Sequence, residues 1–177
     1  MFDCVKYTKF HLILCICESL VYNTIMIKII KETNTSQQTK QLGELIGKYS
    51  DVGTSFTLSG NLGAGKTTLT KGIAKGMGIT SVVNSPTFNI CKIYYGDKKL
   101  VHIDAYRLSK ASDELGFEEE MDDAITVVEW ACNSDMELLN VSQITIESMD
   151  DNKRRIIFEL NDQCNPLLVK ELNLWQV

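Results

Sequence analysis

Residues 60–67 read Gly-Asn-Leu-Gly-Ala-Gly-Lys-Thr, a complete Gly-x-x-x-x-Gly-Lys-Thr phosphate loop. The preceding stretch, residues 54–59, is β-branched and apolar, and it predicts a buried strand. Residues 68–77 follow the motif and contain no helix breaker apart from Gly72 and Gly76. The motif therefore has the strand-loop-helix setting that a phosphate-binding loop needs and that a chance glycine-rich turn would lack.

The residue types of this motif suit a triphosphate. Gly60, Gly63 and Gly65 can adopt backbone angles that are closed to other residues, so that successive amide hydrogens can converge on phosphate oxygens. The helix that begins near Lys66 adds the positive end of its dipole, and Lys66 places a cation against the β- and γ-phosphates. Thr67 offers the hydroxyl that commonly completes a magnesium shell. The stretch predicts a nucleoside triphosphate site with Mg²⁺.

Composition limits the possible functions. A chain of 177 residues is most simply one domain, and 44% apolar with 23% charged residues is typical of a soluble globular protein. The 18 basic and 23 acidic residues give a net charge of −5, which argues against a protein that grips nucleic acid alone. A role connected with RNA would need partner proteins to hold the RNA.

The cysteines and the N-terminal segment bear on localisation. None of the six cysteines forms a Cys-x-x-Cys pair, and their spacing fits neither a zinc site nor a secreted disulfide framework. The apolar run at residues 10–17 is too short to span a bilayer, and no small-residue cleavage site follows it. We expect a cytoplasmic protein that has no contact with a membrane and whose cysteines act as small apolar residues.

A second methionine, Met26, opens a more regular sequence. We expect translation to start there, with residues 1–25 being an extension that is disordered or without function. Residues 26–177 then form the phosphate-loop domain.

The rest of the chain alternates strand and helix patterns. Asn34, Thr35 and Ser36 offer N-cap chemistry, and Gly76 and Gly78 offer C-cap residues after the second helix. The expected elements are an edge strand at 26–31, a helix at 37–48, a hairpin of 90–95 with 100–104, an acidic helix at 112–123, a buried strand at 124–128 and a final hairpin around 150–152. This order predicts a single α/β domain of the P-loop NTPase type, with a mostly parallel central sheet, helices on both faces and antiparallel hairpin additions.

Two predicted strands end in an acid. Residues 100–104 end at Asp104 and residues 126–129 end at Glu129, and both segments have the form of a Walker B element. Because parallel strands present their carboxyl ends at the same edge of a sheet, either acid could reach Mg²⁺. The sequence does not choose between them, and for each the alternative is an acid that merely caps the next helix.

Three further residues have both a functional and a structural interpretation. Thr87 lies where nucleotide-sensing switch loops usually lie, but Ser-Pro-Thr at 85–87 also suits an ordinary turn. His102 alternates with apolar residues and by itself is typical of a satisfied core histidine. Trp130 has core or rim packing as its default role, with nucleotide stacking as the second option.

Arginine and acidic residues are unevenly distributed. The chain has three arginines, Arg107, Arg154 and Arg155, whereas small-molecule kinases of this fold usually surround the transferred phosphoryl group with several. An arginine supplied by a partner is the known alternative. Seven of the eleven residues at 113–123 are acidic, which suits a solvated helix face or a docking surface for a basic partner. No Asn/Thr-Lys-x-Asp segment that would read guanine is present, so we favour ATP over GTP.

Four segments together resemble a known family, the TsaE (YjeE) ATPases of bacterial tRNA modification. They are the phosphate loop at 60–68, Ser-Pro-Thr-Phe at 85–88, His-Ile-Asp-Ala-Tyr-Arg-Leu at 102–108 and Val-Glu-Trp at 128–130. Their order and spacing are far more specific than the loop alone, and the resemblance runs from about Met26 to the last hairpin.

The resemblance implies a Mg²⁺-dependent ATPase that acts with the proteins TsaB and TsaD in making N6-threonylcarbamoyladenosine (t6A), and that meets tRNA only through that complex. It implies catalytic roles for Asp104 as the acid near the attacking water, Thr87 as the switch threonine and Lys66 as the cation at the phosphates. Thr67 and Glu129 would ligate Mg²⁺. The nucleotide contacts would come from Ser36, Gly63, Ala64, Gly65, Lys66, Thr67, Thr68 and Trp130.

Two other functions stay open at the level of sequence. One is a phosphotransferase for a small metabolite, which would need an acceptor pocket and a phosphate-closing lid. The other is a nucleotide-gated binding module with negligible hydrolysis, in which ATP only sets the shape of the loop around Thr87.

Overall fold

The computed structural model describes residues 26–86, 89–108, 116, 118–133, 136–150 and 152–177. Within these ranges the expected elements form in the expected order, with a helix at the C-terminus in addition. The elements are β1 (Met26–Thr33), α2 (Ser36–Tyr49), β2 (Ser55–Ser59), α3 (Lys66–Gly76), β3 (Cys91–Tyr95), β4 (Lys99–Asp104), a 3₁₀ turn (Ala105–Arg107), α4 (Glu118–Met121), β5 (Ala124–Glu129), a second 3₁₀ turn (Ala131–Asn133), β6 (Val141–Ser148), β7 (Arg154–Asn161) and α5 (Pro166–Leu174).

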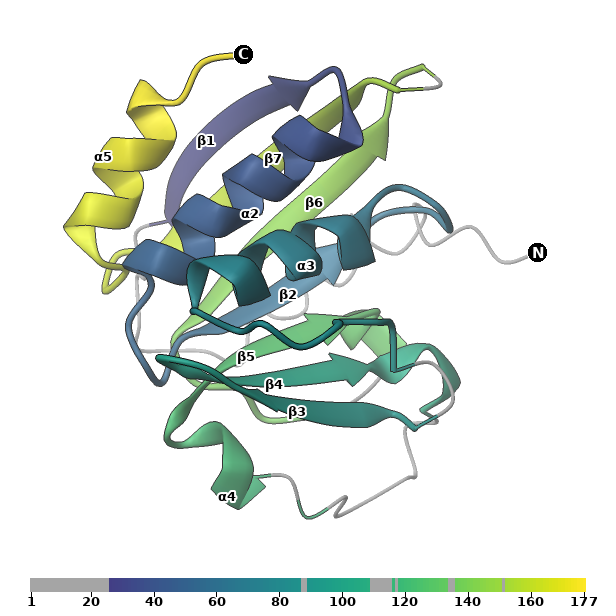
Figure 1. The fold of residues 1–177 in the computed structure, drawn as a ribbon, viewed down its shortest axis with the longest axis vertical. Coiled ribbons are helices and arrows are strands. Elements are labelled where there is room, and N and C mark those ends of the chain that lie inside the picture. Colours follow the sequence, from purple (N-terminus) through teal and green to yellow (C-terminus); the bar gives the residue numbers. More distant parts are fainter. Residues whose placement is uncertain (1–25, 87–88, 109–115, 117, 134–135, 151) are drawn as a thin grey trace, which may run out of the picture.

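The strands form one seven-stranded sheet of order β1-β7-β6-β2-β5-β4-β3 (Figure 1). The four central strands, β6, β2, β5 and β4, run parallel, so β2, which leads into the phosphate loop, has a parallel neighbour on each side. Antiparallel pairing adds β7 and then β1 at one edge and β3 at the other. This is the predicted single α/β domain of the P-loop type with antiparallel hairpin additions, and β1 is the predicted edge strand.

The helices begin and end where side-chain chemistry favours it. Thr35 caps α2, because its Oγ1 accepts a hydrogen bond from the Gln38 backbone amide at 3.2 Å. The helix α5 was not predicted, although Asn165 and Pro166 are a typical helix start: the Asn165 side chain accepts from the Leu167 amide, and proline occupies the first turn.

Glycines set how closely α2 and α3 pack. On α2, Gly43 and Gly47 face α3, and on α3, Gly72 and Gly76 face α2; a Cβ added at any of the four would overlap backbone atoms of the other helix. The prediction that Gly76 is a C-cap residue was therefore wrong, since Gly76 is the last helical residue and Met77 is the cap. Gly78 has the positive φ of 74° that suits the residue after a helix end.

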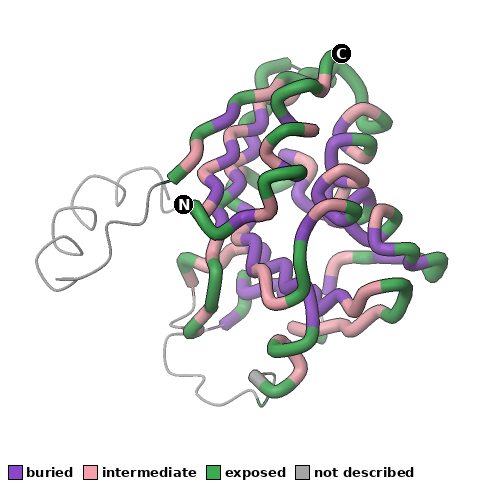
Figure 2. The backbone as a smooth tube through the Cα atoms, turned by 90° about the vertical axis from the view of Figure 1, so that its left-hand side faces the viewer, coloured by how far each residue is buried: buried purple, intermediate pink, exposed green. Residues whose placement is uncertain are grey.

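The core lies mainly between the sheet and three helices. Apolar side chains of α2, α3 and α5 pack with one face of the sheet in a large cluster that includes Phe56, Ile73 and Phe158. On the other face a smaller cluster around Val101 and Val128 is covered by α4 and neighbouring segments. The strands β4 and β5 are almost wholly buried, and Figure 2 shows buried residues gathered in the interior of the molecule. In the part of the chain that the structure describes, the longer helices thus lie on the same side of the sheet as the phosphate-loop helix.

Among its described residues, the acidic segment that was expected to be helical over 112–123 forms the helix α4, while 109–115 and 117 lie outside the described part. Lys99 on β4 pairs with Glu120 at 3.0 Å and with Asp123, so part of the acidic charge is neutralised within the chain. Residues 1–25 also lie outside the described part, and none of the described helices has the length and apolar character needed to cross a bilayer.

Cys91 and Cys164 are free thiols. Burial raises the pKa of Cys91 and of Cys164 to about 11, so both stay protonated at neutral pH, and Cys164 belongs to the large apolar cluster. They behave as the small apolar residues that were expected. Cys132 differs, because it is exposed.

We expect Gly47→Ala to destabilise the protein, although alanine is the better helix former by up to ~1 kcal/mol. The new methyl group would overlap the Ile73 carbonyl of α3 and push the two helices apart. Overpacking of this kind costs about 1–3 kcal/mol, which urea denaturation would measure as a lower free energy of unfolding. Gln41→Ala, at an exposed position of the same helix, is the control and should change stability by less than about 0.5 kcal/mol. A Gly47→Ala protein as stable as the parent would show that the glycine contact does not limit the packing.

Candidate functional site

The phosphate loop joins the end of β2 to the start of α3. Gly60, Gly63 and Gly65 have φ values of 145°, 77° and 115°, which L-residues with side chains rarely adopt. A Cβ at Gly60 would overlap the Ile146 carbonyl of β6, whereas a Cβ at Gly63 or Gly65 would meet no atom within 4 Å. The loop thus rests on β6 through its first glycine and borders open space at the other two, as an anion cradle built from backbone amides requires.

Lys66, the first residue of α3, has its side chain folded along this loop. Its Nζ donates hydrogen bonds to the carbonyls of Gly60 at 2.8 Å and Asn61 at 3.1 Å, and it lies 3.9 Å from the centre of the Trp130 ring. Burial lowers the pKa of Lys66, while the charges of Glu129 and Asp104 act in the opposite direction. The loop therefore holds one cation with backbone carbonyls and an aromatic face around it.

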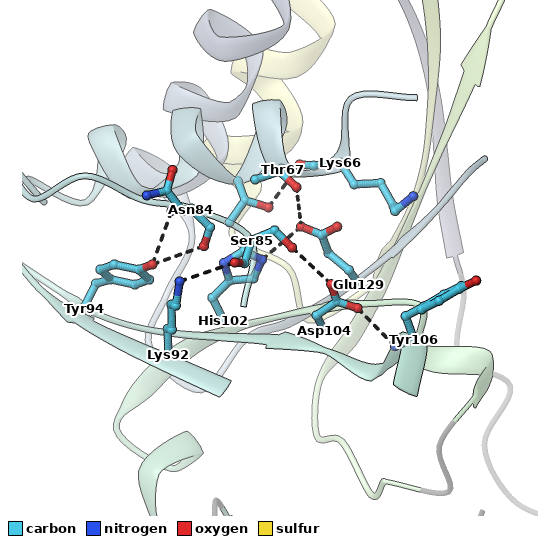
Figure 3. A network of polar contacts seen from close by, with 11 residues as sticks. Lys66, Thr67, Asn84, Ser85, Lys92, Tyr94, His102, Asp104, Tyr106 and Glu129 are labelled. Atoms are coloured by element: carbon cyan, nitrogen blue, oxygen red, sulfur yellow. Dashed lines mark hydrogen bonds and ion pairs between the residues drawn. The ribbon is translucent and has the colours of Figure 1, made fainter. Parts of the chain in front are cut away.

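The two strand-end acids lie side by side. Asp104 at the end of β4 and Glu129 at the end of β5 are register partners, and both are buried. The Glu129 Oε1 accepts a hydrogen bond from the Thr67 hydroxyl at 3.0 Å (Figure 3). The Asp104 Oδ2 accepts from the Ser85 hydroxyl at 3.1 Å, and its Oδ1 accepts from the Tyr106 backbone amide at 3.0 Å. Glu129 thus faces the phosphate-loop helix, and Asp104 faces the segment that follows Asn84.

His102 holds the Glu129 carboxylate from the other side. Its Nε2 lies 3.0 Å from the same Oε1 atom that Thr67 contacts, and the imidazole is fully buried. A carboxylate can only accept, so Nε2 carries the proton. The Nδ1 atom has no hydrogen-bond partner in the described structure. His102 was expected to be a satisfied core histidine, but it is bonded to the site. Its spacing from Asp104 could have shown this, because residues two apart on a strand share a face.

Trp130 and Tyr106 form the rim beside Lys66. Their rings meet edge to face with centroids 5.2 Å apart, and Trp130 adopts a positive φ of 61° where β5 leaves the sheet. The strained turn directs the indole over the Lys66 ammonium group rather than into the core. Rim packing was one of the two roles expected for Trp130.

The oxygen atoms at this site suit magnesium. The Thr67 hydroxyl and the Glu129 carboxylate are hard oxygen donors 3.0 Å apart, next to the loop. No group of three or more His, Cys, Asp or Glu side chains in the described ranges is arranged to hold a metal ion. A metal here would therefore share its coordination with phosphate oxygens and water, as Mg²⁺ usually does.

Comparison with known proteins places the chain in a family. The sequence model for the threonylcarbamoyl adenosine biosynthesis protein TsaE matches residues 33–157. This chain belongs to the TsaE family. The tRNA threonylcarbamoyladenosine biosynthesis protein TsaE of Bacillus subtilis is 40% identical over 144 residues, which cover 80% of this chain and 91% of that protein. The protein of the same name from Treponema pallidum is 33% identical over 128 residues, 70% of this chain and 95% of that protein.

A solved structure supports the same placement. The crystal structure of YdiB from Bacillus subtilis superimposes with a TM-score of 0.71 at 34% sequence identity, covering 84% of this chain and 96% of that one. The resemblance to the TsaE family that the four sequence segments indicated is thus confirmed, and so is the fold.

The structure brings together most of the residues that were predicted for the site. The loop residues 63–68, the two acids and Trp130 lie around one end of α3. Thr87 and Phe88 lie outside the described residues, so the predicted switch threonine has no described position. Ser36 is the exposed first residue of α2, and no hydrogen bond from it to the loop is seen in the described structure.

One residue at the loop was missed by sequence reasoning. Arg154, the first residue of β7, donates a hydrogen bond from Nε to the Ala64 carbonyl at 2.8 Å. The sequence drew attention to Arg154 only as one of three arginines. No local signal could have found the contact, because it joins residues 90 positions apart through the order of the strands.

A double-mutant cycle can test whether His102 acts through Glu129. His102→Leu removes a donor from a buried carboxylate, and a hydrogen bond to a charged group contributes about 1.5–3 kcal/mol to the free energy of unfolding. In a Glu129→Leu background the same change should cost less or even stabilise, since no carboxylate remains to be satisfied. Urea denaturation of the four proteins gives the coupling energy. Equal costs of His102→Leu in both backgrounds would mean that His102 only fills space.

Proposed function

We propose that this TsaE family member hydrolyses ATP with Mg²⁺ as a cytoplasmic component of the machinery that makes t6A, acting with TsaB and TsaD. The observation that carries the proposal is the convergence of a cation, a hydroxyl and two carboxylates at one end of the phosphate-loop helix. In particular, Thr67 and Glu129 are hydrogen-bonded, and Asp104 is the register partner of Glu129. A loop that only turned the chain would not need a buried acid pair beside it.

The residues divide the work of phosphoryl transfer to water. The backbone amides of residues 63–68 bind phosphate oxygens, and Lys66 exchanges its carbonyl partners, Gly60 and Asn61, for the β- and γ-phosphates. Thr67 and Glu129 would hold the metal ion, which would supply positive charge that neutralises the phosphates. His102 keeps Glu129 oriented toward Thr67. Glu129 is positioned by the end of β5, and Lys66 and Thr67 by the first turn of α3.

Asp104 is the residue best placed to act on the attacking water. Its Oδ1 is fixed by the Tyr106 amide, and its Oδ2 accepts a hydrogen bond from the Ser85 hydroxyl, which rotates more readily than a backbone group. In the proposed mechanism Asp104 orients a water molecule and accepts its proton as the water oxygen bonds to the γ-phosphorus, while the bond from this phosphorus to the β–γ bridging oxygen breaks and ADP leaves. The capping of the 3₁₀ turn by Asp104, which was the alternative interpretation, serves to orient the carboxylate.

The arginine positions support a dependence on partners. Arg155 pairs with Glu32 at 3.0 Å on the surface, and Arg154 is bonded to the loop through the Ala64 carbonyl. A guanidinium at the transferred phosphate raises turnover strongly, whereas these two contacts are with Glu32 and the Ala64 carbonyl. We therefore propose that TsaB and TsaD complete the site, and that tRNA is met only through them, consistent with the net charge of −5.

Lys66→Ala should abolish measurable ATP binding, because it removes the only lysine that the described structure places at the loop. Isothermal titration calorimetry with ATP and Mg²⁺ measures this. Lys71→Ala, at an exposed position of the same helix, is the matched control and should bind like the parent protein. Unchanged ATP affinity in Lys66→Ala would contradict the assignment of the loop.

The isolated protein should turn over ATP slowly, and addition of TsaB and TsaD should raise the rate. Phosphate release, measured with and without the two partners, tests this prediction. Turnover of tens per second by the protein alone would lie in the range of kinases, about 1–100 per second, and would contradict partner dependence.

Asp104→Ala should keep ATP affinity but lose the stimulated turnover and t6A formation. If Asp104→Ala still supported t6A formation, the chain would be a nucleotide-gated binding module instead.

A further inference from the structure

We propose that Arg154 is a positioning residue for the phosphate loop: it fixes the peptide between Ala64 and Gly65 so that the Gly65 amide faces the phosphates. This inference rests on the proposed function of the loop in binding ATP. It concerns a residue from the last hairpin, far from the motif in sequence.

The Arg154 guanidinium joins the loop to the turn between β6 and β7. Its Nε donates to the Ala64 carbonyl at 2.8 Å, while Nη1 donates to the carbonyls of Asp150 at 3.0 Å and Lys153 at 2.9 Å. The turn itself is closed by a hydrogen bond from the Met149 amide to the Lys153 carbonyl at 3.0 Å. The arginine is thus fixed on the side of the hairpin and holds one carbonyl of the loop. Only a guanidinium, which has several N–H donors in a planar fork, can donate to the loop carbonyl and to the turn carbonyls at once.

Because the peptide group is planar, the hydrogen bond to the Ala64 carbonyl also sets the direction of the Gly65 N–H. In a trans peptide the C=O and the following N–H lie in one plane and point in opposite directions. The Ala64 carbonyl points to Arg154, so the Gly65 N–H points away from it. Ala64 is buried and Gly65 borders the open side of the loop, where a Cβ would meet no atom within 4 Å. In the proposed arrangement the amide faces this open side, on which phosphate would bind.

This peptide needs an external support because its own residue cannot fix it. Gly65 has no side chain to restrict rotation, its φ of 115° lies in a region that glycine leaves easily, and the open space around it offers no packing. If the peptide rotated, a carbonyl oxygen would replace the amide hydrogen and repel phosphate. A hydrogen bond from a charged donor is roughly twice as strong as a neutral one, and Arg154 supplies it. Fixing the loop before binding lowers the ordering cost that would otherwise reduce affinity.

The chain offers a matched control in the next residue. Arg155 has the same charge and follows Arg154 on β7, but its side chain pairs with Glu32 on the surface. Arg155→Ala therefore tests for the loss of one positive charge near the site, without the loss of the loop contact. Arg154→Lys tests the opposite case, because it keeps the charge and loses the fork.

The experiment compares ATP affinity by calorimetry in the presence of Mg²⁺ with the amide signal of Gly65 in protein labelled with ¹⁵N-glycine. Arg154→Ala and Arg154→Lys should weaken binding of ATP, and of inorganic triphosphate as a probe without nucleoside, about tenfold or more. The Gly65 amide should shift and exchange its hydrogen faster in both variants before any ligand is added. Arg155→Ala should stay within about twofold of the parent affinity and leave the Gly65 signal unchanged.

Three outcomes would overturn the inference. Parent-like ATP affinity in Arg154→Lys would do so. An equal loss of ATP affinity in Arg155→Ala would do so as well, because it would show that only the positive charge matters. Weaker binding with an unchanged Gly65 amide would show that Arg154 acts by direct contact with the nucleotide instead. If Arg154→Ala does not fold, Arg154→Lys still decides. Failure of the parent protein to bind ATP would contradict the proposed function, whereas parent-like binding by both Arg154 variants, with loss in Lys66→Ala, would contradict only the role of Arg154.

Discussion

The buried carboxylate of Glu129 is the constraint on which the site depends. One of its oxygens accepts hydrogen bonds from Thr67 on α3 and from His102 on β4, while the residue itself ends β5. A buried charge is tolerated only where donors surround it, so these three elements cannot separate without exposing or orphaning the carboxylate. The interaction that would hold a metal ion thus also holds the phosphate-loop helix against the sheet. The atoms that stabilise this arrangement are thus the ones to which the proposed function assigns the metal ion.

The position of α3 is fixed from its other side by α2. Gly43 and Gly47 on α2 meet Gly72 and Gly76 on α3 closely enough that a methyl group on any of them would overlap backbone. The helix that begins at Lys66 is therefore set in place by backbone contact along its length and by the Glu129 hydrogen bond at its start. Glycine lowers the intrinsic stability of both helices. In return the two helices pack closely, which restricts movement of the start of α3.

The sequence predicted those parts of the molecule whose signals are local. The loop motif, the strands around it and the two strand-end acids follow from residue pattern and from the rule that parallel strands share a carboxyl edge. Contacts that depend on the order of the strands could not be predicted. The approach of Arg154 to Ala64 requires β7 to lie next to β6 and β6 next to β2, an order that no local pattern encodes. The role of Gly76 also depends on a distant contact. A glycine at a helix end suits both a cap and a close helix contact, and the sequence does not show that α2 packs against it.

The antiparallel hairpin at the sheet edge is therefore more than an extension of the sheet. The first glycine of the loop rests on the Ile146 carbonyl of β6, and Arg154 of β7 holds the Ala64 carbonyl. A glycine-rich loop gains freedom from its composition, and that freedom opposes binding unless the surrounding structure removes it. β6 and β7 supply this support through their contacts with Gly60 and Ala64, while β4 and β5 supply Asp104 and Glu129. A change of shape in the β6–β7 turn would therefore reach the loop through the Arg154 guanidinium and would alter how the peptide between Ala64 and Gly65 is held.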